Sequence, residues 1–152
     1  MSDPKSIRHI VVLRKNCIFK LYVKDTKGRL LSIPQLEELL HVVCQKAEAE
    51  DAAEHFAVGF LTALDRDAWA LARGELEENK SNQTSLKSID EAIFVLALDS
   101  DEFEEKDKNE KDSDICFLER CVHGRARNRW LDKSLCLTLG PKGRLGVSFE
   151  HS

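Results

Sequence analysis

A continuously apolar stretch at residues 92–98, AIFVLAL, sets the strongest limit on the fold of this chain. Acidic residues bound it on both sides. A run of this length and composition is typical of a strand that is buried on both faces, because a half-exposed strand would alternate apolar and polar residues. We therefore predict a central strand at 92–98, with other elements covering each face of the sheet.

Four more segments carry strand patterns, being β-branched and aromatic or alternating apolar with polar residues: 9–14, 17–23, 134–140 and 144–150. Lys15 and Asn16 separate the first two, which predicts a hairpin. A glycine- and proline-containing turn at 140–143 joins the last two. We expect the last strand to lie at the centre of the sheet beside 92–98, with Leu145, Val147 and Phe149 on the core side.

Helical signals occupy the part of the chain between the strands. Ser32 and Gln35 form a capping-box pattern before a helix whose apolar face is Leu36, Leu39, Leu40, Val43 and Ala47. Thr62 and Asp65 give a second capping signature, before a helix with Trp69, Ala72 and Leu76 directed inward. We predict a loop at 79–83, a short helix from Ser85 with Leu86 and Ile89 on one side, and a short helix at 115–124.

The order β-β-α-α-α-β-α-β-β predicts an α/β (α+β) fold with a mixed sheet and flanking helices. One domain over 1–152 suits the length, with a solvated acidic loop at 99–114. The net charge of −4 argues against a nucleic-acid or membrane-surface protein. The five cysteines form no Cys-x-x-Cys pair and the histidines have no ligand spacing, so we expect packed thiols and no metal site.

Two groups of residues could carry chemistry. His151 has the same parity as the apolar face of the last strand, so it is either a rim histidine able to act as a base near neutral pH or a frayed terminal residue. Arg125, Arg127 and Arg129 alternate along 123–134. They could contact phosphate, but we favour a structural arginine paired with Asp132. Trp130 is expected to be a packing anchor.

Motifs along the chain resemble the carnitine/choline acyltransferase family. They are LTALDRDAWA at 61–70, the Asn82–Leu86 motif, HGRARNRWLDKS at 123–134 and GVSFEHS at 146–152, in this order. The phenylalanine–lysine pair at 19–20, the GRLL at 28–31 and the HGR at 123–125 are most similar to the carnitine palmitoyltransferase branch. The resemblance implies part of a chloramphenicol-acetyltransferase-like half of such an enzyme.

The resemblance also implies a function. His151 would be the catalytic general base, with Asp132 and Arg66 supporting the site. The reaction would transfer a fatty acyl group, expected to be long-chain (palmitoyl), between coenzyme A and carnitine. Coenzyme A and its acyl ester would be substrates, and no covalently bound cofactor or metal is expected. The location would be mitochondrial, with the peroxisome as the alternative, and any membrane association would come from segments outside this chain.

The chain departs from the family pattern in two ways. Leu131 stands where members usually have an aromatic residue, and the acidic residue, coenzyme A site, carnitine-binding arginine and oxyanion-stabilising cluster that follow the histidine motif are missing. We therefore expect a fragment that is inactive and poorly soluble without a complementary enzyme half. The alternatives are a non-catalytic acyltransferase-like binding or regulatory module, a choline acetyltransferase-like fragment, and a nucleic-acid-binding protein, which the negative charge disfavours.

Overall fold

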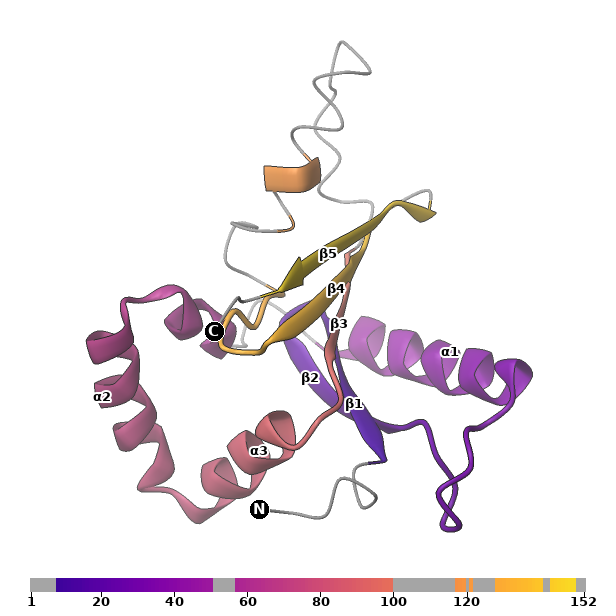
Figure 1. Cartoon of the computed structure of the whole chain (residues 1–152), viewed down its shortest axis with the longest axis horizontal. Helices are drawn as coiled ribbons and strands as arrows, with labels where there is room; N and C mark the ends of the chain where they lie inside the picture. Colours follow the sequence, from indigo (N-terminus) through magenta and orange to yellow (C-terminus); the bar gives the residue numbers. More distant parts are fainter. Residues whose placement is uncertain are drawn as a thin grey trace, which may run out of the picture.

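One mixed sheet organises the protein (Figure 1). The computed structural model describes residues 8–50, 57–99, 117–119, 121, 128–140 and 143–149. Its elements are β1 (His9–Arg14), β2 (Cys17–Tyr22), α1 (Ile33–Ala49), the 3-10 helix η2 (Val58–Ala63), α2 (Arg66–Glu77), α3 (Lys80–Asp90), β3 (Val95–Leu98), β4 (Leu135–Leu139) and β5 (Leu145–Phe149). The strand order is β2-β1-β3-β4-β5. The inner pairs β1–β3 and β3–β4 are parallel and the outer pairs antiparallel, which confirms the predicted α/β class.

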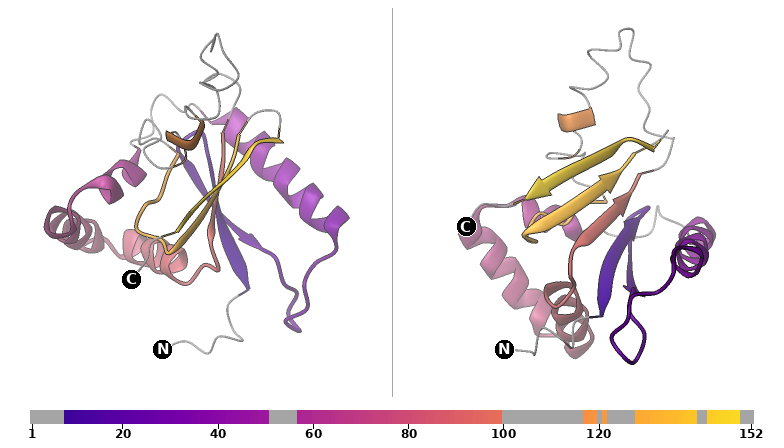
Figure 2. Two further views of the ribbon diagram at one scale, coloured as in Figure 1. Left: turned by 45° about the horizontal axis from the view of Figure 1, so that its top comes forward. Right: turned by 45° about the vertical axis from the view of Figure 1, so that its right-hand side comes forward.

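β3 is the central strand, as the apolar run at 92–98 predicts, and its two faces belong to two separate cores. Val95 and Ala97 pack into a core shared with α2 and α3, together with Val11 and Leu13 of β1. The intervening residues of β1 and β3 pack into a second core shared with α1. Figure 2 shows α1 on one side of the sheet and α2 with α3 on the other. Burial on both sides explains why β3 has no polar residue.

The last strand is not central, so that prediction is wrong. β5 pairs only with β4 among the described strands and forms an edge of the sheet. Leu145, Val147 and Phe149 are 61%, 52% and 72% exposed instead of facing the core. Gly146 is the buried position, and a Cβ there would collide with the Cys121 Sγ. Alternation identifies a strand, but only the packing of neighbouring elements decides which face is covered.

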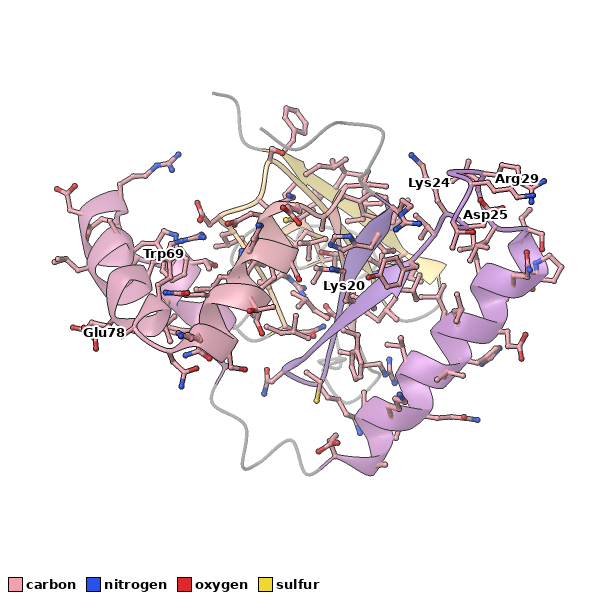
Figure 3. The ribbon with its side chains drawn as sticks, turned by 90° about the horizontal axis from the view of Figure 1, so that it is seen from below. Lys20, Lys24, Asp25, Arg29, Trp69 and Glu78 are labelled. Atoms are coloured by element: carbon pink, nitrogen blue, oxygen red, sulfur yellow. The ribbon has the colours of Figure 1, made fainter. Side chains whose placement is uncertain are left out.

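Turns and caps fix the ends of the first elements. Lys15 and Asn16 both have positive φ, 48° and 62°, as a tight two-residue hairpin turn requires, which confirms the predicted hairpin. Asp25 and Arg29 lie side by side in the turn before α1 (Figure 3), and Arg29 Nε donates to Asp25 Oδ2 at 2.8 Å. Gln35 Oε1 accepts the Ser32 backbone N–H at 2.9 Å, as the capping-box pattern predicts.

Two predicted boundaries in the helical region are wrong. Asp65, not Thr62, caps α2, because its Oδ1 accepts from the backbone N–H groups of Asp67 and Ala68. The expected loop at 79–83 is the first turn of α3, which Asn79 caps. Leu86 and Ile89 are buried on one side of α3, as expected.

Several other predictions concern residues outside the described part. The proposed helix at 115–124 is described only at 117–119 and 121, which are helical. The expected acidic loop lies outside the described residues after Asp99. In the described ranges, no helix combines the length and the apolar character needed to span a bilayer.

Candidate functional site

The residues that the sequence singles out divide between described and undescribed parts of the chain. His151, Arg125 and Arg127 lie outside the described residues. Arg66 opens α2, and Asp132 belongs to the stretch that leads into β4, here called the 128–133 segment. The geometry of the candidate site is therefore that of the 128–133 segment and the elements it touches.

Three side chains from one face of α2 lie close to the carboxylate group of Asp132. Trp69 Nε1 donates to Asp132 Oδ2 at 2.7 Å, Arg66 Nη1 lies 3.9 Å from Oδ1, and Arg73 Nη1 lies 3.7 Å from Oδ2. Positions 66, 69 and 73 recur at helical spacing, so they project from the same side of α2. The structure thus brings Arg66 and Asp132 together, and their supporting role in catalysis remains a prediction.

Arg73, which sequence reasoning missed, connects α2 to the end of α3. Its Nη1 and Nη2 atoms lie 3.2 and 2.6 Å from the two carboxylate oxygens of Asp90, and its Nε donates to Glu77 at 2.8 Å. The hydrogen bonds to Asp90 are the largest cause of a raised pKa for Arg73. The guanidinium also lies 6.0 Å from the Trp69 ring centroid. The signal available in the sequence was the seven-residue spacing from Arg66.

Arg129 is the buried structural arginine, but its partner is Asp99 rather than Asp132. Arg129 Nη1 and Nη2 donate to the two Asp99 oxygens at 2.8 and 2.7 Å, and Arg129 is only 5% exposed. Asn128 Nδ2 donates to the same carboxylate at 3.0 Å. The predicted pairing with Asp132 fails because residues three apart in a non-helical stretch point in different directions. The Asp99 pair ties the 128–133 segment to the end of β3.

The remaining members of the segment complete its attachment. Trp130 is 1% exposed and meets Trp69 edge-to-face, with ring centroids 6.0 Å apart, which confirms it as a packing anchor. Lys133 Nζ donates to the carbonyl oxygens of Ile89 and Asp90 at the end of α3. Burial lowers the pKa of Lys133. Burial also raises the pKa of the nearby Cys136 thiol to about 11, so this cysteine is a packed thiol and not a nucleophile at neutral pH.

Together these contacts hold β4, and through it β5, against α2, α3 and β3. Phe149, the last residue of β5, pairs with Leu135, three residues after Asp132. The described residues contain no group of three or more histidine, cysteine or acidic side chains placed to hold a metal ion. Chemically, the arrangement is a set of hydrogen bonds and ion pairs that attach β4 and its partner β5 to the neighbouring elements, and the Glu-His-Ser motif follows β5 in the sequence.

Comparison with known proteins agrees with this architecture. A model of the Choline/Carnitine o-acyltransferase family matches residues 1–152. The chain is 33% identical over 151 residues to the mitochondrial carnitine O-palmitoyltransferase 2 of Homo sapiens, covering 99% of this chain and 21% of that protein. The mitochondrial carnitine O-palmitoyltransferase 2 of Xenopus tropicalis is 32% identical over 146 residues, which are 95% of this chain and 20% of that protein.

A third relative is the liver isoform of human carnitine O-palmitoyltransferase 1, 29% identical over 145 residues, or 95% of this chain and 18% of that protein. The fold is of the α/β class, and the family match covers the whole chain. The chain belongs to the choline/carnitine O-acyltransferase family. It spans about one-fifth of the length of the relatives that it matches.

Proposed function

We propose that this chain is the part of a carnitine O-acyltransferase that carries the catalytic base, His151, for transfer of a long-chain acyl group between coenzyme A and carnitine. The observation that carries the proposal is the family match over 1–152, with carnitine O-palmitoyltransferases among the relatives. The long-chain substrate and a mitochondrial location are taken from the names of those relatives.

The chemistry assigns one role to His151. Its neutral imidazole removes the proton from the carnitine hydroxyl while that oxygen attacks the thioester carbon of acyl-CoA. The carbon–sulfur bond then breaks, and the imidazolium returns the proton to the coenzyme A thiolate. Proton transfer of this kind contributes roughly 10²–10⁴ in rate. Alignment of the two substrates contributes much more to the rate, and it requires substrate-binding groups besides His151.

The supporting role proposed for Arg66 and Asp132 is indirect. Their contacts with Trp69 and Arg73 fix the 128–133 segment, and the pairing of β4 with β5 extends that order to Phe149. His151 follows Phe149, the last residue of β5, by two positions in the sequence. We propose that the rest of the acyltransferase, supplied as a complementary half, provides the substrate-binding groups.

A chimera tests this function. Residues 1–152 replace the matching segment of human carnitine O-palmitoyltransferase 2, and coenzyme A release is followed with palmitoyl-CoA and carnitine. We expect turnover by the chimera and a loss of about 10²-fold or more in the His151→Ala chimera. His41→Ala, a change at an exposed histidine of α1, is the matched control and should retain activity. Replacing carnitine with choline in the same assay distinguishes the two acceptors.

The isolated chain gives the complementary measurement. With the same substrates it should show no turnover above its His151→Ala variant. A folded chimera whose activity is unchanged by His151→Ala would refute the assignment of the base.

A further inference from the structure

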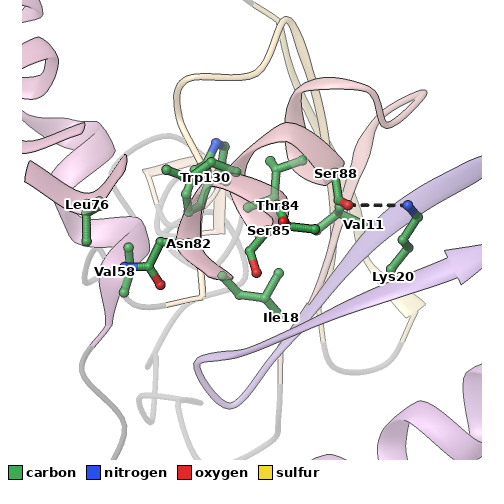
Figure 4. A pocket seen from close by; sticks show the side chains of 12 residues that line it. Val11, Ile18, Lys20, Val58, Leu76, Asn82, Thr84, Ser85, Ser88 and Trp130 are labelled. Atoms are coloured by element: carbon green, nitrogen blue, oxygen red, sulfur yellow. Dashed lines mark hydrogen bonds between the residues drawn. The ribbon is translucent and has the colours of Figure 1, made fainter. Parts of the chain in front are cut away.

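A hollow lies on the α3 side of the sheet, where the hairpin, α2, η2 and α3 leave part of the surface open (Figure 4). Its volume is about 360 Å³, near the lower end of the roughly 300–1,000 Å³ typical of small-molecule sites. The site residues discussed above do not use it, apart from Trp130 in its wall. Its size fits a compact ligand better than an extended one.

The floor and walls of the hollow are apolar. Val11 of β1 and Trp130, both 1% exposed, belong to the core beneath it. Leu86 and Ile89 contribute the inner side of α3, and Ile18 of β2 is 42% exposed at the opening. The apolar surface that remains accessible in the lining comes from Ile18 and from the half-buried Val58 of η2 and Leu76 of α2. A ligand entering here would remove that surface from water, which favours a hydrocarbon group.

The rim has a single sign of charge. Lys20 Nζ lies at the edge and donates to Ser88 Oγ at 3.3 Å. The other polar lining residues, Asn82, Thr84 and Ser85, are neutral. Within the described residues no carboxylate lies within ion-pairing distance of Lys20, and the lining contains no acidic residue. An anion could therefore approach this ammonium group without displacing a competing acidic side chain.

We propose that the hollow binds a small hydrophobic carboxylate, with the hydrocarbon group against Ile18, Val58 and Leu76 and the carboxylate at Lys20 and Ser88. The apolar floor selects the tail, and the lone rim cation with adjacent hydroxyl groups selects the head group. Binding requires neither coenzyme A nor carnitine, so this inference is independent of the proposed function.

Octanoate binding to the 152-residue chain tests the proposal, with amide NMR as the readout. We expect saturable shifts at the α3 amides of Asn82, Ser85 and Ser88. The series butyrate, hexanoate, octanoate should bind about fourfold more tightly per added methylene. Octanol and octyltrimethylammonium, which lack the negative charge, should bind more weakly than octanoate.

Three variants separate the contribution of the Lys20 charge to binding from that of the apolar hollow. Lys20→Gln should weaken octanoate binding about two- to fivefold and leave octanol binding unchanged. Lys27→Gln, the same charge change in the exposed turn before α1, should have no effect. Ser85→Phe, at an exposed position, should abolish binding of both probes by filling the hollow. Absence of saturable shifts on α3, equal affinity for all three head groups, or identical effects of the two lysine variants would overturn the proposal.

Discussion

His9 is a buried histidine at the start of β1, 5% exposed, whose Nε2 donates to the Ser88 carbonyl oxygen at 2.7 Å. Burial is the largest cause of a pKa below its ordinary 6.5, and Lys20 and Lys133 lower it further, against opposing contributions from Ser88 and Glu91. As the pH falls, His9 therefore binds a proton at a higher pH in the unfolded chain than in the folded protein. The free energy of unfolding should decrease as the pH falls below about 6.5.

The His9→Gln variant isolates this effect, because glutamine can still donate to Ser88 but does not titrate. Urea unfolding at several pH values between 7 and 5 should show a shallower loss of stability in His9→Gln than in the original chain. His41→Gln, at an exposed position on α1, should keep the original slope. Equal slopes for His9→Gln and the original chain would contradict the prediction.

At the scale of single elements, α3 depends on its cap. Asn79 Oδ1 accepts from the backbone N–H groups of Ser81 and Asn82 at 2.8 and 3.4 Å. Removing a cap of this kind costs about 1 kcal/mol. Asn79→Ala should therefore lower the free energy of unfolding by about 1 kcal/mol, measured in urea, whereas Asn79→Asp should preserve it. If Asn79→Ala left the free energy of unfolding unchanged, packing alone would define where α3 begins.

The same element shows why the sequence predicted some boundaries and not others. The buried face of α3 was predicted correctly from Leu86 and Ile89, because apolar residues at helical spacing mark the side of a helix that packs against the core. The first turn, Lys80 to Gln83, is polar and exposed or half-buried, so its composition is equally typical of a loop. In the structure the backbone hydrogen bond from Gln83 N to the Asn79 carbonyl oxygen and the side-chain cap of Asn79 identify it as helix.

The sequence predicted those parts of the candidate site that local motifs mark, and it did not predict the contacts between residues far apart in the chain. The family motifs pointed to Arg66 and Asp132, and these side chains do lie together. The partner of Arg129 was not predictable, because Asp99 is thirty residues away and only the pairing of β3 with β4 brings it close. Trp69 at Asp132 belongs to the same class of long-range contact.

At the scale of the whole molecule, β5 forms an edge of the sheet (Figure 2), and the apolar side chains on one of its faces are exposed. Leu145, Val147 and Phe149 are all more than half exposed. The outer edge of β5 has no partner among the described strands, so it offers backbone groups to another chain. Self-association through β5 would bury both features at once. The 152-residue chain should therefore associate as its concentration rises, which sedimentation velocity or gel filtration would measure.

A charge placed on that face should prevent association without unfolding the protein. Val147→Lys adds a solvated ammonium group at a position 52% exposed, so the melting temperature should change little while the chain remains monomeric to higher concentration. Leu71→Lys makes the same kind of change at an exposed position of α2, 74% exposed and away from the strand edge, and should not reduce association. If the unmodified chain stays monodisperse at all concentrations, or if both variants act alike, association does not depend on β5. The exposed face would then be stable in water on its own, as a scattered set of surface apolar residues can be.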